Sequence, residues 1–464
     1  MKLNEKSNPI KQSSDYLSFF KDLNISKKTL ITLFKLGYKK MTTIQKITIP
    51  PALKGIDILG SARTGSGKTL CFIIPIIEIL SYQKWTKKDN IGACIISPVR
   101  ELAIQIFDFT KNISKNHDLG IGILIGGKII KKKQISIISS TPGCLFSHLT
   151  DDKGLNLDNL KILAIDEADR ILDNSFWRII DLTSNFLPKK KQILLFSATL
   201  NSKIKNITRL NLKNPIFCSL DKNNSKVKKI FRVGISCNLN QIKHFVILLH
   251  NHEKFNNLFS FLRSHKTQKI IVFISTAKQV KFLFEIFKSI YPEFVIFCIY
   301  GTMNQEKRIN NFLNFNNSCS GALLSTDLTA RGLDFKSIDW IVQLDCPQTI
   351  ECYVHRVGRT GRFLDTGKAI LFLDYSETRF IKLLRKQSIN IHCVKFNKRQ
   401  IVSIQLKLEM LLKKNIYYLS LAKNTFISYA KFIYLQKNKH FSNFNSFNWK
   451  EIANSYGIFN FLEK

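Results

Sequence analysis

The sequence predicts an α/β protein with two tandem parallel-sheet domains and a helical C-terminal extension. Short apolar runs that end in small or acidic residues alternate with amphipathic stretches, which is typical of buried parallel strands alternating with helices. A polar segment, DKNNSKVKK, separates two sets of such runs. After Phe396 the strand pattern stops, and the rest of the chain is basic, rich in aromatic residues and of helical character.

The expected strands lie in the runs DILGSA, GACIISP, KILAIDEAD and QILLFSAT of the first set, and in KIIVFIST, FVIFCIYG, GALLSTD, WIVQLD and AILFL of the second. The chain has 464 residues, so each domain is long enough to bury a core without disulfide bonds. The expected organisation is an N-terminal tail (1–19), a first domain (20–220), a linker (221–230), a second domain (231–396) and the extension (397–464).

The extension carries too many apolar residues for a disordered tail. In FISYAKFIYL, Phe426, Tyr429, Phe432 and Ile433 recur at helical spacing, so one face can pack on the second domain while lysines stay outside. We expect the aromatic side chains to be core residues and the lysines to contact nucleic acid.

A formal net charge of +38 favours a polyanionic partner, because a field of that size recruits phosphate backbones. A compositional origin competes with this interpretation, since the sequence is heavy in Lys, Asn, Ile and Phe, as AT-rich coding would produce. AT-rich coding does not favour arginine, and arginine is scarce in this chain. Even so, arginines fall inside the motifs described below, at Arg63, Arg100, Arg331, Arg356, Arg359 and Arg362.

The ten cysteines form no C-x-x-C pair, which favours a reducing compartment over a zinc site or a disulfide framework. The first residues lack the apolar segment of a signal peptide, and no apolar run reaches membrane-spanning length. We therefore expect a soluble protein with no membrane partner.

The stretch SARTGSGKT matches the phosphate-binding pattern G-x-x-x-x-G-K-[ST], except that Ala62 replaces the first glycine. Gly65, Gly67, Lys68 and Thr69 keep the parts that wrap phosphates with backbone N–H groups, reach the outer phosphates and meet Mg²⁺. Alanine can occupy the first turn if φ stays negative there, so the substitution favours a particular kind of loop.

Acidic residues follow the expected strand KILAI, in the sequence DEAD. A carboxylate from Asp166 behind a phosphate loop suits Mg²⁺, directly or through water, and Glu167 could orient or deprotonate an attacking water. Four such residues alone would be an ordinary acidic turn. Their place downstream of a phosphate loop favours the functional interpretation.

The second domain contributes STDLTARGLD and HRVGRTGR. A basic cluster at a helix start is usually a solvated face. Arg359 and Arg362 lie three apart, however, so they share a helical face and could reach one phosphate chain. Phosphoryl transfer needs cations at the γ-phosphate, and an arginine from another domain would make hydrolysis conditional on closure.

Together these motifs resemble those of the DEAD-box RNA helicases, whose core is two RecA-like domains. The resemblance covers about 20–396 and rests on GYKKMTTIQ, ARTGSGKT, PVRELA, TPGC, DEAD, SAT, STDLTARGLD and HRVGRTGR. The phosphate loop of this family ordinarily begins with alanine. The resemblance implies Mg²⁺ and ATP as cofactors and RNA as partner.

The resemblance also implies roles for individual residues. The residues implied to bind ATP are Phe20, Tyr38, Gln45, Thr64, Gly65, Ser66, Gly67, Lys68, Thr69 and Asp334. Among them, Gln45 would recognise adenine and Tyr38 would stack on it. Phe20 would support the pocket, and Asp334 would approach the ribose. Catalysis falls to Lys68, Asp166, Glu167 and the arginine fingers Arg359 and Arg362, with Thr69 and Asp166 holding the metal. RNA backbone contacts fall on Arg100, Gly126, Gly127, Thr141, Pro142, Gly143 and Thr326, and coupling between the domains on Ser197, Thr199 and His355.

Within the family, WTKKDNIGACIISPVRELA, DEADRILD, LPKKKQILLFSATL and DWIVQLDCPQTIECYVHRVGRTGR resemble the nucleolar subfamily active in small-subunit ribosome biogenesis. That resemblance implies a monomer in the nucleus and nucleolus, acting on pre-rRNA or a pre-ribosomal particle; cytoplasm or another reducing compartment is the alternative. Contacts to phosphate and 2′-hydroxyl groups imply little base specificity.

Four positions depart from the family pattern: Met41 replaces proline, Val99 replaces threonine, Tyr300 replaces histidine, and Cys144 replaces the arginine of TPGR. We expect the first three to alter packing, and Cys144 to remove a cation near the RNA groove. The expected activity is ATP-dependent separation of short RNA duplexes. A DNA translocase, and an RNA clamp or assembly scaffold in which ATP sets residence time, are the alternatives.

Overall fold

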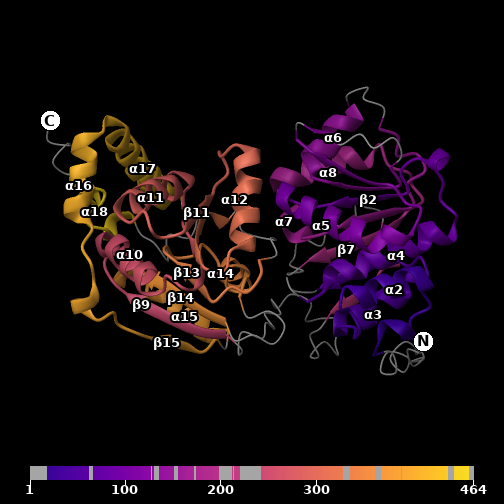
Figure 1. Ribbon diagram of the computed structural model, residues 1–464, viewed down its shortest axis with the longest axis horizontal. Coiled ribbons are helices and arrows are strands. Elements are labelled where there is room, and N and C mark those ends of the chain that lie inside the picture. Colours follow the sequence, from indigo (N-terminus) through magenta and orange to yellow (C-terminus); the bar gives the residue numbers. More distant parts are fainter. Residues whose placement is uncertain are drawn as a thin grey trace, which may run out of the picture. The chain divides into compact units, whose positions relative to one another are not determined.

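The computed structural model describes residues 18–61, 66–126, 128–129, 135–150, 155–171, 174–197, 212, 214–219, 242–327, 335–360, 367–387, 389–436 and 444–458. The chain divides into two compact units, Met1–Ser236 and Cys237–Lys464, which are described separately (Figure 1). The expected linker, 221–230, lies outside the described residues. The domain bounds therefore remain predictions.

The sheet of the first unit has the strand order β4-β3-β5-β2-β6-β7-β1-β8, with β4 antiparallel to β3 and the other described pairs parallel. Its strands are β1 (Ile58–Ser61), β2 (Ala93–Ile96), β3 (Ile121–Ile125), β4 (Lys128–Ile129), β5 (Ile137–Ser140), β6 (Ile162–Ile165), β7 (Gln192–Ser197) and β8 (Ile216–Ser219). Its helices are η1 (Phe20–Asp22), α2 (Lys27–Lys35), α3 (Thr43–Leu53), α4 (Lys68–Tyr82), η2 (Lys87–Asp89), α5 (Arg100–Ile113), η3 (Ser114–Asn116), α6 (Pro142–Thr150), α7 (Ala168–Ile171) and α8 (Asn174–Ser184).

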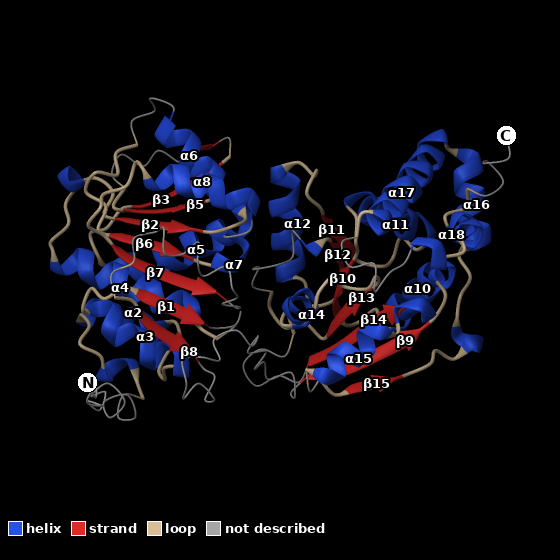
Figure 2. Cartoon of the chain, turned by 180° about the vertical axis from the view of Figure 1, so that it is seen from behind, coloured by secondary structure: helices blue, strands red, loops and turns tan. Residues whose placement is uncertain are grey.

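Both faces of this sheet are buried, which explains why its strands are continuous apolar runs. Successive residues of a strand point to opposite faces. In β2, Ala93 and Ile95 belong to one buried cluster, while Cys94 and Ile96 belong to another. Helices lie on both faces of each sheet (Figure 2). Functional residues in such a sheet are expected in the loops that follow the carboxyl ends of the parallel strands.

The sheet of the second unit has the order β11-β12-β10-β13-β14-β9-β15, and its described pairs are parallel. Its strands are β9 (Ile242–Leu248), β10 (Lys269–Phe273), β11 (Ile296–Ile299), β12 (Gly321–Ser325), β13 (Trp340–Gln343), β14 (Gly367–Leu373) and β15 (Ile391–Cys393). Its helices are η7 (Asn251–Glu253), α10 (Lys254–Ser264), α11 (Ala277–Ile290), α12 (Gln305–Asn317), α14 (Ile350–Val357), η8 (Tyr375–Glu377), α15 (Arg379–Lys386) and η9 (Lys398–Gln400).

The helical extension is confirmed. It consists of α16 (Gln405–Lys414), α17 (Ile416–Tyr434), η10 (Phe444–Ser446) and α18 (Trp449–Ser455). Leu408, Tyr429 and Tyr456 belong to the same buried cluster as Val272 and Phe282 of the α/β core. The extension therefore completes the core of the second unit.

The apolar face expected on α17 is also confirmed. Tyr429 and Ile433 are buried, while Phe426 and Phe432 pack against the same cluster. This helix meets α11 at Thr425, whose hydroxyl oxygen lies 2.7 Å from the carbonyl oxygen of Leu421 in its own helix and 3.2 Å from that of Lys278 in α11.

The predicted fold class, two α/β units with parallel sheets and a helical extension, is confirmed. Among the described residues, no helix combines the length and the apolar character needed to cross a membrane.

Candidate functional site

The end of the phosphate-loop motif is shaped by Gly67, the residue that precedes α4. Its φ of +87° lies in the left-handed region, which glycine adopts without the steric cost of a side chain. A Cβ atom at this position would lie 2.5 Å from Nε2 of Gln45. Backbone conformation and close packing therefore both require glycine here.

Gln45, the residue expected to recognise adenine, is buried in α3 and engaged at both ends of its amide. Its Oε1 accepts from the backbone N–H of Thr42 at 2.7 Å, and its Nε2 donates to the carbonyl oxygen of Gly67 at 3.0 Å. An amide retains one donor and one acceptor site after two such bonds. Gln45 thus ties α3 to the phosphate-loop motif and keeps hydrogen-bonding capacity for a ligand.

Lys68, the first residue of α4, carries a buried ammonium group. Its Nζ lies 3.8 Å from Oδ1 of Asp166 and has no hydrogen-bond partner among the described residues. The side chain is only 6% exposed. Burying a charge without hydrogen bonds is costly, so this position favours an additional anionic oxygen.

Asp166 and Glu167 follow β6 and are both buried. Burial raises the pKa of Asp166 to about 6; the nearby Lys68 opposes this rise, and the charge of Glu167 adds to it. Glu167 has a φ of +50°, which is strained for a residue with a side chain, and its N–H donates to Asp166 Oδ1 at 2.9 Å. The site therefore concentrates negative charge that a cation would stabilise.

Ser197, at the carboxyl end of β7, contacts the same segment. Its hydroxyl donates to Oδ1 of Asp169 at 2.8 Å. Because β6 and β7 are neighbours in the sheet, this bond links the segment SAT to the segment DEAD. Asp169 was missed as a site residue, although its place as the last carboxylate of DEAD could have indicated it.

The aromatic residues expected at adenine lie near the start of the first unit. Phe20 is fully buried in η1, and its N–H donates to the carbonyl oxygen of Lys39 at 3.2 Å. The ring of Tyr38 lies edge-on to Phe109, with centroids 6.0 Å apart. Phe20 thus fixes the backbone next to Tyr38, as a supporting residue would.

Three of the segments expected to contact RNA follow β2, β5 and β3, which are consecutive in the sheet. Arg100 begins α5 after β2, Gly126 follows β3, and Thr141 follows β5. A Cβ atom on Gly126 would overlap the guanidinium of Arg100. The structure therefore brings these two predicted residues together, and a side chain at position 126 would require the guanidinium of Arg100 to move.

Pro142 and Gly143 begin α6 beside Thr141, where Gly143 has open space around it. Cys144, which we expected to lie near an RNA groove, is only 9% exposed and belongs to a buried apolar cluster. This burial argues against a place at an open groove. Of the other departures, Met41 is a core residue, while Val99 and Tyr300 pack against the two cores, in agreement with effects on packing.

In the second unit, Thr326 follows β12 and is 7% exposed. Arg359 follows α14, is buried, and donates from its Nε to the carbonyl oxygen of His355 at 3.1 Å. Its side chain is thus folded back toward its own helix. The predicted site residues Thr64, Gly65, Gly127, Thr199, Asp334 and Arg362 lie outside the described residues.

The structure adds an ion pair between the two motifs of the second unit. Arg356 is 2% exposed and donates from Nε and Nη2 to the two carboxylate oxygens of Asp327, at 2.6 and 2.7 Å. In the sequence, Arg356 stands out only as one of the motif arginines. The pair joins STDLTARGLD to HRVGRTGR, and only the folded chain shows that the two residues meet.

Comparisons with known proteins agree with this geometry. The family model for the DEAD/DEAH box helicase matches residues 42–207, and that for the helicase conserved C-terminal domain matches residues 253–364. Among relatives, the probable ATP-dependent RNA helicase ddx10 of Dictyostelium discoideum is 39% identical over 445 residues, covering 95% of this chain and 50% of its own length. ATP-dependent RNA helicase DBP4 of Chaetomium globosum is 39% identical over 464 residues, covering 98% of this chain and 54% of its own length.

The chain therefore spans about half the length of the curated relatives it matches. Among solved structures, Mss116p with an NTE and C-tail double deletion, bound to single-stranded RNA and AMP-PNP, has a TM-score of 0.78 at 23% identity. That match covers 99% of this chain and 92% of the Mss116p chain, and it supports the fold. The two family models, the relatives and the motifs lead to one conclusion: the chain belongs to the DEAD/DEAH box helicases.

Proposed function

We propose that the chain is an ATP-dependent RNA helicase that locally unwinds or remodels RNA duplexes or ribonucleoprotein. The observation that carries this proposal is the ammonium group of Lys68, which is buried at a helix start, faces one carboxylate and lacks a hydrogen-bond partner among the described residues. A triphosphate would supply the missing anionic oxygens, and the N–H groups at the helix start would bind them as well.

At the nucleotide, Gln45 would use its remaining donor and acceptor on adenine, and Tyr38 would stack on the base. Lys68 would bind the outer phosphates. Glu167, whose Oε2 has no hydrogen-bond partner among the described residues and lies 3.8 Å from Arg170, would orient or deprotonate the attacking water.

The residues fit Mg²⁺. Asp166 and Thr69 offer the hard oxygen ligands that this ion prefers. Burial raises the pKa of Asp166 to about 6, and a bound cation would favour its charged form. When bound, Mg²⁺ would neutralise charge on the β- and γ-phosphates. Asp166 and Thr69 would hold it, directly or through water.

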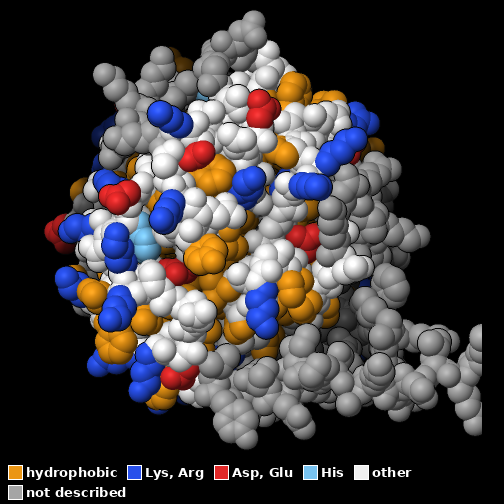
Figure 3. All heavy atoms as spheres, turned by 90° about the vertical axis from the view of Figure 1, so that its right-hand side faces the viewer, with side chains coloured by type: hydrophobic (Ala, Val, Ile, Leu, Met, Phe, Trp, Pro, Cys, Tyr) orange, Lys and Arg blue, Asp and Glu red, His pale blue; other side chains and the backbone are white. Residues whose placement is uncertain are grey.

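RNA would bind at the carboxyl ends of β3, β5 and β2, where Arg100, Gly126 and Thr141 follow their strands. Contacts from an arginine and from backbone N–H groups suit phosphate and sugar, so binding would depend little on sequence. Charge alone does not locate this surface. Figure 3 shows Lys and Arg side chains spread over the face of the first unit that it displays, with hydrophobic side chains among them.

Arg359 and Arg362 belong to the other unit, so a role at the γ-phosphate requires the two units to come together when ATP and RNA bind. Arg359 has five N–H donors, so it could bind a phosphate oxygen through Nη1 or Nη2 while its Nε keeps the bond to the His355 carbonyl oxygen. Its arrival at the γ-phosphate would couple RNA binding to ATP turnover.

The biological setting we propose is ribosome biogenesis, with pre-rRNA or a pre-ribosomal particle as substrate and a monomer acting in the nucleolus. Support comes from the subfamily resemblance of WTKKDNIGACIISPVRELA and DWIVQLDCPQTIECYVHRVGRTGR. Crosslinking the protein to RNA in its own cells and sequencing the bound fragments tests this setting; recovery of mainly messenger RNA would contradict it.

The activity itself is tested with the full chain and Lys68→Ala as control. We expect ATP turnover to rise with RNA and not with DNA of the same sequence, and short RNA duplexes to separate only with hydrolysable ATP. RNA-stimulated turnover without strand separation, together with a long lifetime on RNA with a non-hydrolysable analogue, would identify an RNA clamp instead. Equal stimulation by DNA would favour a translocase.

A further inference from the structure

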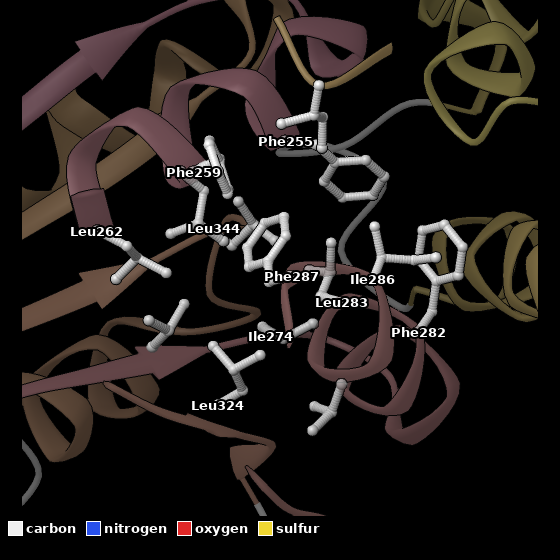
Figure 4. Packing of buried hydrophobic residues seen from close by; sticks show 14 of the residues in the cluster. Phe255, Phe259, Leu262, Ile274, Phe282, Leu283, Ile286, Phe287, Leu324 and Leu344 are labelled. Atoms are coloured by element: carbon white, nitrogen blue, oxygen red, sulfur yellow. The ribbon is translucent and has the colours of Figure 1, made fainter. Parts of the chain in front are cut away.

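The C-terminal extension reaches a buried polar residue of the α/β core through Tyr456. This tyrosine follows α18, is 1% exposed, and accepts a hydrogen bond from Nε2 of Gln279 at 3.0 Å. Its ring packs edge-on against Phe255, with centroids 4.9 Å apart, and lies tilted against Phe282 at 5.4 Å. Figure 4 shows these two phenylalanines at the side of the cluster next to the yellow helices of the extension.

Gln279 also contacts the loop after β10. Its Oε1 accepts from the backbone N–H of Thr276 at 3.3 Å and from the hydroxyl of Thr276 at 3.2 Å. Ser275, one residue earlier, donates its N–H to Oδ2 of Asp345 at 3.1 Å. The loop is therefore held between α11 on one side and Asp345, which follows β13, on the other.

Asp345 in turn contacts the arginine that joins the two motifs of this unit. Its carbonyl oxygen accepts from Nη1 of Arg356 at 3.2 Å, and Arg356 donates from Nε and Nη2 to the carboxylate of Asp327. The carboxylate of Asp345 also lies 3.6 Å from the buried ammonium of Lys254. A continuous set of polar contacts, buried at Gln279, Asp345 and Arg356 and partly exposed at Ser275 and Thr276, thus runs from the extension to STDLTARGLD and HRVGRTGR.

A second buried tyrosine of the extension has a hydroxyl contact outside this route. Tyr429 is 4% exposed, and its hydroxyl lies 3.5 Å from Oδ1 of Asn251 in η7, the limit of a hydrogen bond. Burial, with the charge of Asp345 next in size, raises the pKa of both tyrosines well above the usual value, so both stay protonated at neutral pH. The two residues are matched in type and burial and differ in what their hydroxyl groups contact.

We propose that Tyr456 is a positioning residue, through which the extension sets the placement of Arg356 by way of Gln279, the loop at Ser275 and Thr276, and Asp345. The extension then affects the rate of ATP turnover in addition to any contact with RNA. This inference rests on the ATPase activity proposed above. Removing the Tyr456 hydroxyl leaves Gln279 with an unsatisfied donor, which allows the loop and Asp345 to shift.

The test compares Tyr456→Phe with Tyr429→Phe in the full chain. Deleting the extension is unsuitable, because its helices supply part of the core of the second unit. At saturating RNA, we expect Tyr456→Phe to lower kcat by about fivefold, the factor that corresponds to one buried hydrogen bond, with KM for ATP changed less than about twofold. Tyr429→Phe should keep the kcat of the unchanged chain at a similar melting temperature.

A double-mutant cycle tests the route. In the background of Asp345→Ala, which removes the acceptor of the Ser275 N–H, Tyr456→Phe should have little further effect on kcat. Fully additive effects would contradict the route through Asp345. If Tyr456→Phe and Tyr429→Phe have the same kcat, this inference is wrong and the proposed function is unaffected. No RNA-stimulated turnover in the unchanged chain would overturn the proposed function, and this inference with it.

Discussion

Replacing Gly67 by alanine tests whether the phosphate-loop motif is held by Gln45. Two costs follow from the structure. The φ of +87° is strained for a residue with a side chain, by about 1–2 kcal/mol. The added Cβ, at 2.5 Å from Gln45 Nε2, also forces that amide to move and weakens its bonds to Gly67 and Thr42. Two partly buried hydrogen bonds are worth about 2 kcal/mol together.

Gly55→Ala is the matched control. Gly55 has a similar φ of +78°, and a Cβ there would meet nothing within 4 Å. It therefore carries the backbone strain without the clash. We expect Gly67→Ala to lower the free energy of unfolding of the first unit by about 2 kcal/mol more than Gly55→Ala, and to weaken ATP binding by more than about tenfold, while Gly55→Ala leaves ATP binding unchanged.

Urea unfolding monitored by circular dichroism measures the first quantity, and titration with a fluorescent ATP analogue measures the second. If both variants lose the same stability and bind the nucleotide equally well, the contact between Gln45 and Gly67 does not account for the glycine. In that case backbone strain alone explains it.

Three further outcomes are expected. Lys68→Ala should abolish measurable ATP binding while circular dichroism stays unchanged, because the lost ammonium has a single ion-pair partner among the described residues, Asp166 at 3.8 Å. Normal turnover by this variant would contradict the nucleotide site. Asp327→Ala should destabilise the second unit by about 3 kcal/mol, because it leaves the buried Arg356 without its carboxylate, and an unchanged melting temperature would show that the pair adds nothing. Burial lowers the pKa of His117 below its usual 6.5, so the unfolded chain binds the proton more readily. The free energy of unfolding should therefore fall as the pH drops below about 6.5, and His117→Gln should reduce that slope. An equal slope in the variant would show that His117 does not cause this pH dependence.

Strands buried on both faces could be predicted, because they read as continuous apolar runs. All nine expected runs contain a strand, among them β2 and β10. The buried strands β3 and β5 are nevertheless not among the expected runs, since Gly122 interrupts the apolar residues of β3 and β5 ends in Ser139 and Ser140. Strands with mixed sequences are absent from those runs as well. In β9, Lys243 and His244 interrupt the apolar run, and β15 is an edge strand that pairs only with β9 among the described strands and exposes His392 and Cys393. Their place in the sheet depends on pairing partners far along the chain.

The composition of the site could be predicted better than its contacts. Motif spacing identified Lys68 and Asp166, and the structure places them together. The bond from Gln45 to Gly67 joins positions 22 residues apart, and it depends on how α3 packs beside α4. The burial of Cys144 likewise depends on which face of α6 meets the sheet. The sequence pattern does not determine which residues of two packed helices touch, because several helix orientations satisfy the same periodicity.

The shared core of the second unit has a consequence for synthesis on the ribosome. One buried cluster runs from Ile247 to Ile458, so the unit cannot close its core until α18 has left the exit tunnel. The first unit is free to fold while the second is still being made. During that interval Phe255 and Phe282 lack the ring of Tyr456 that they contact in the folded unit, so the nascent second unit exposes apolar surface of the kind that chaperones bind.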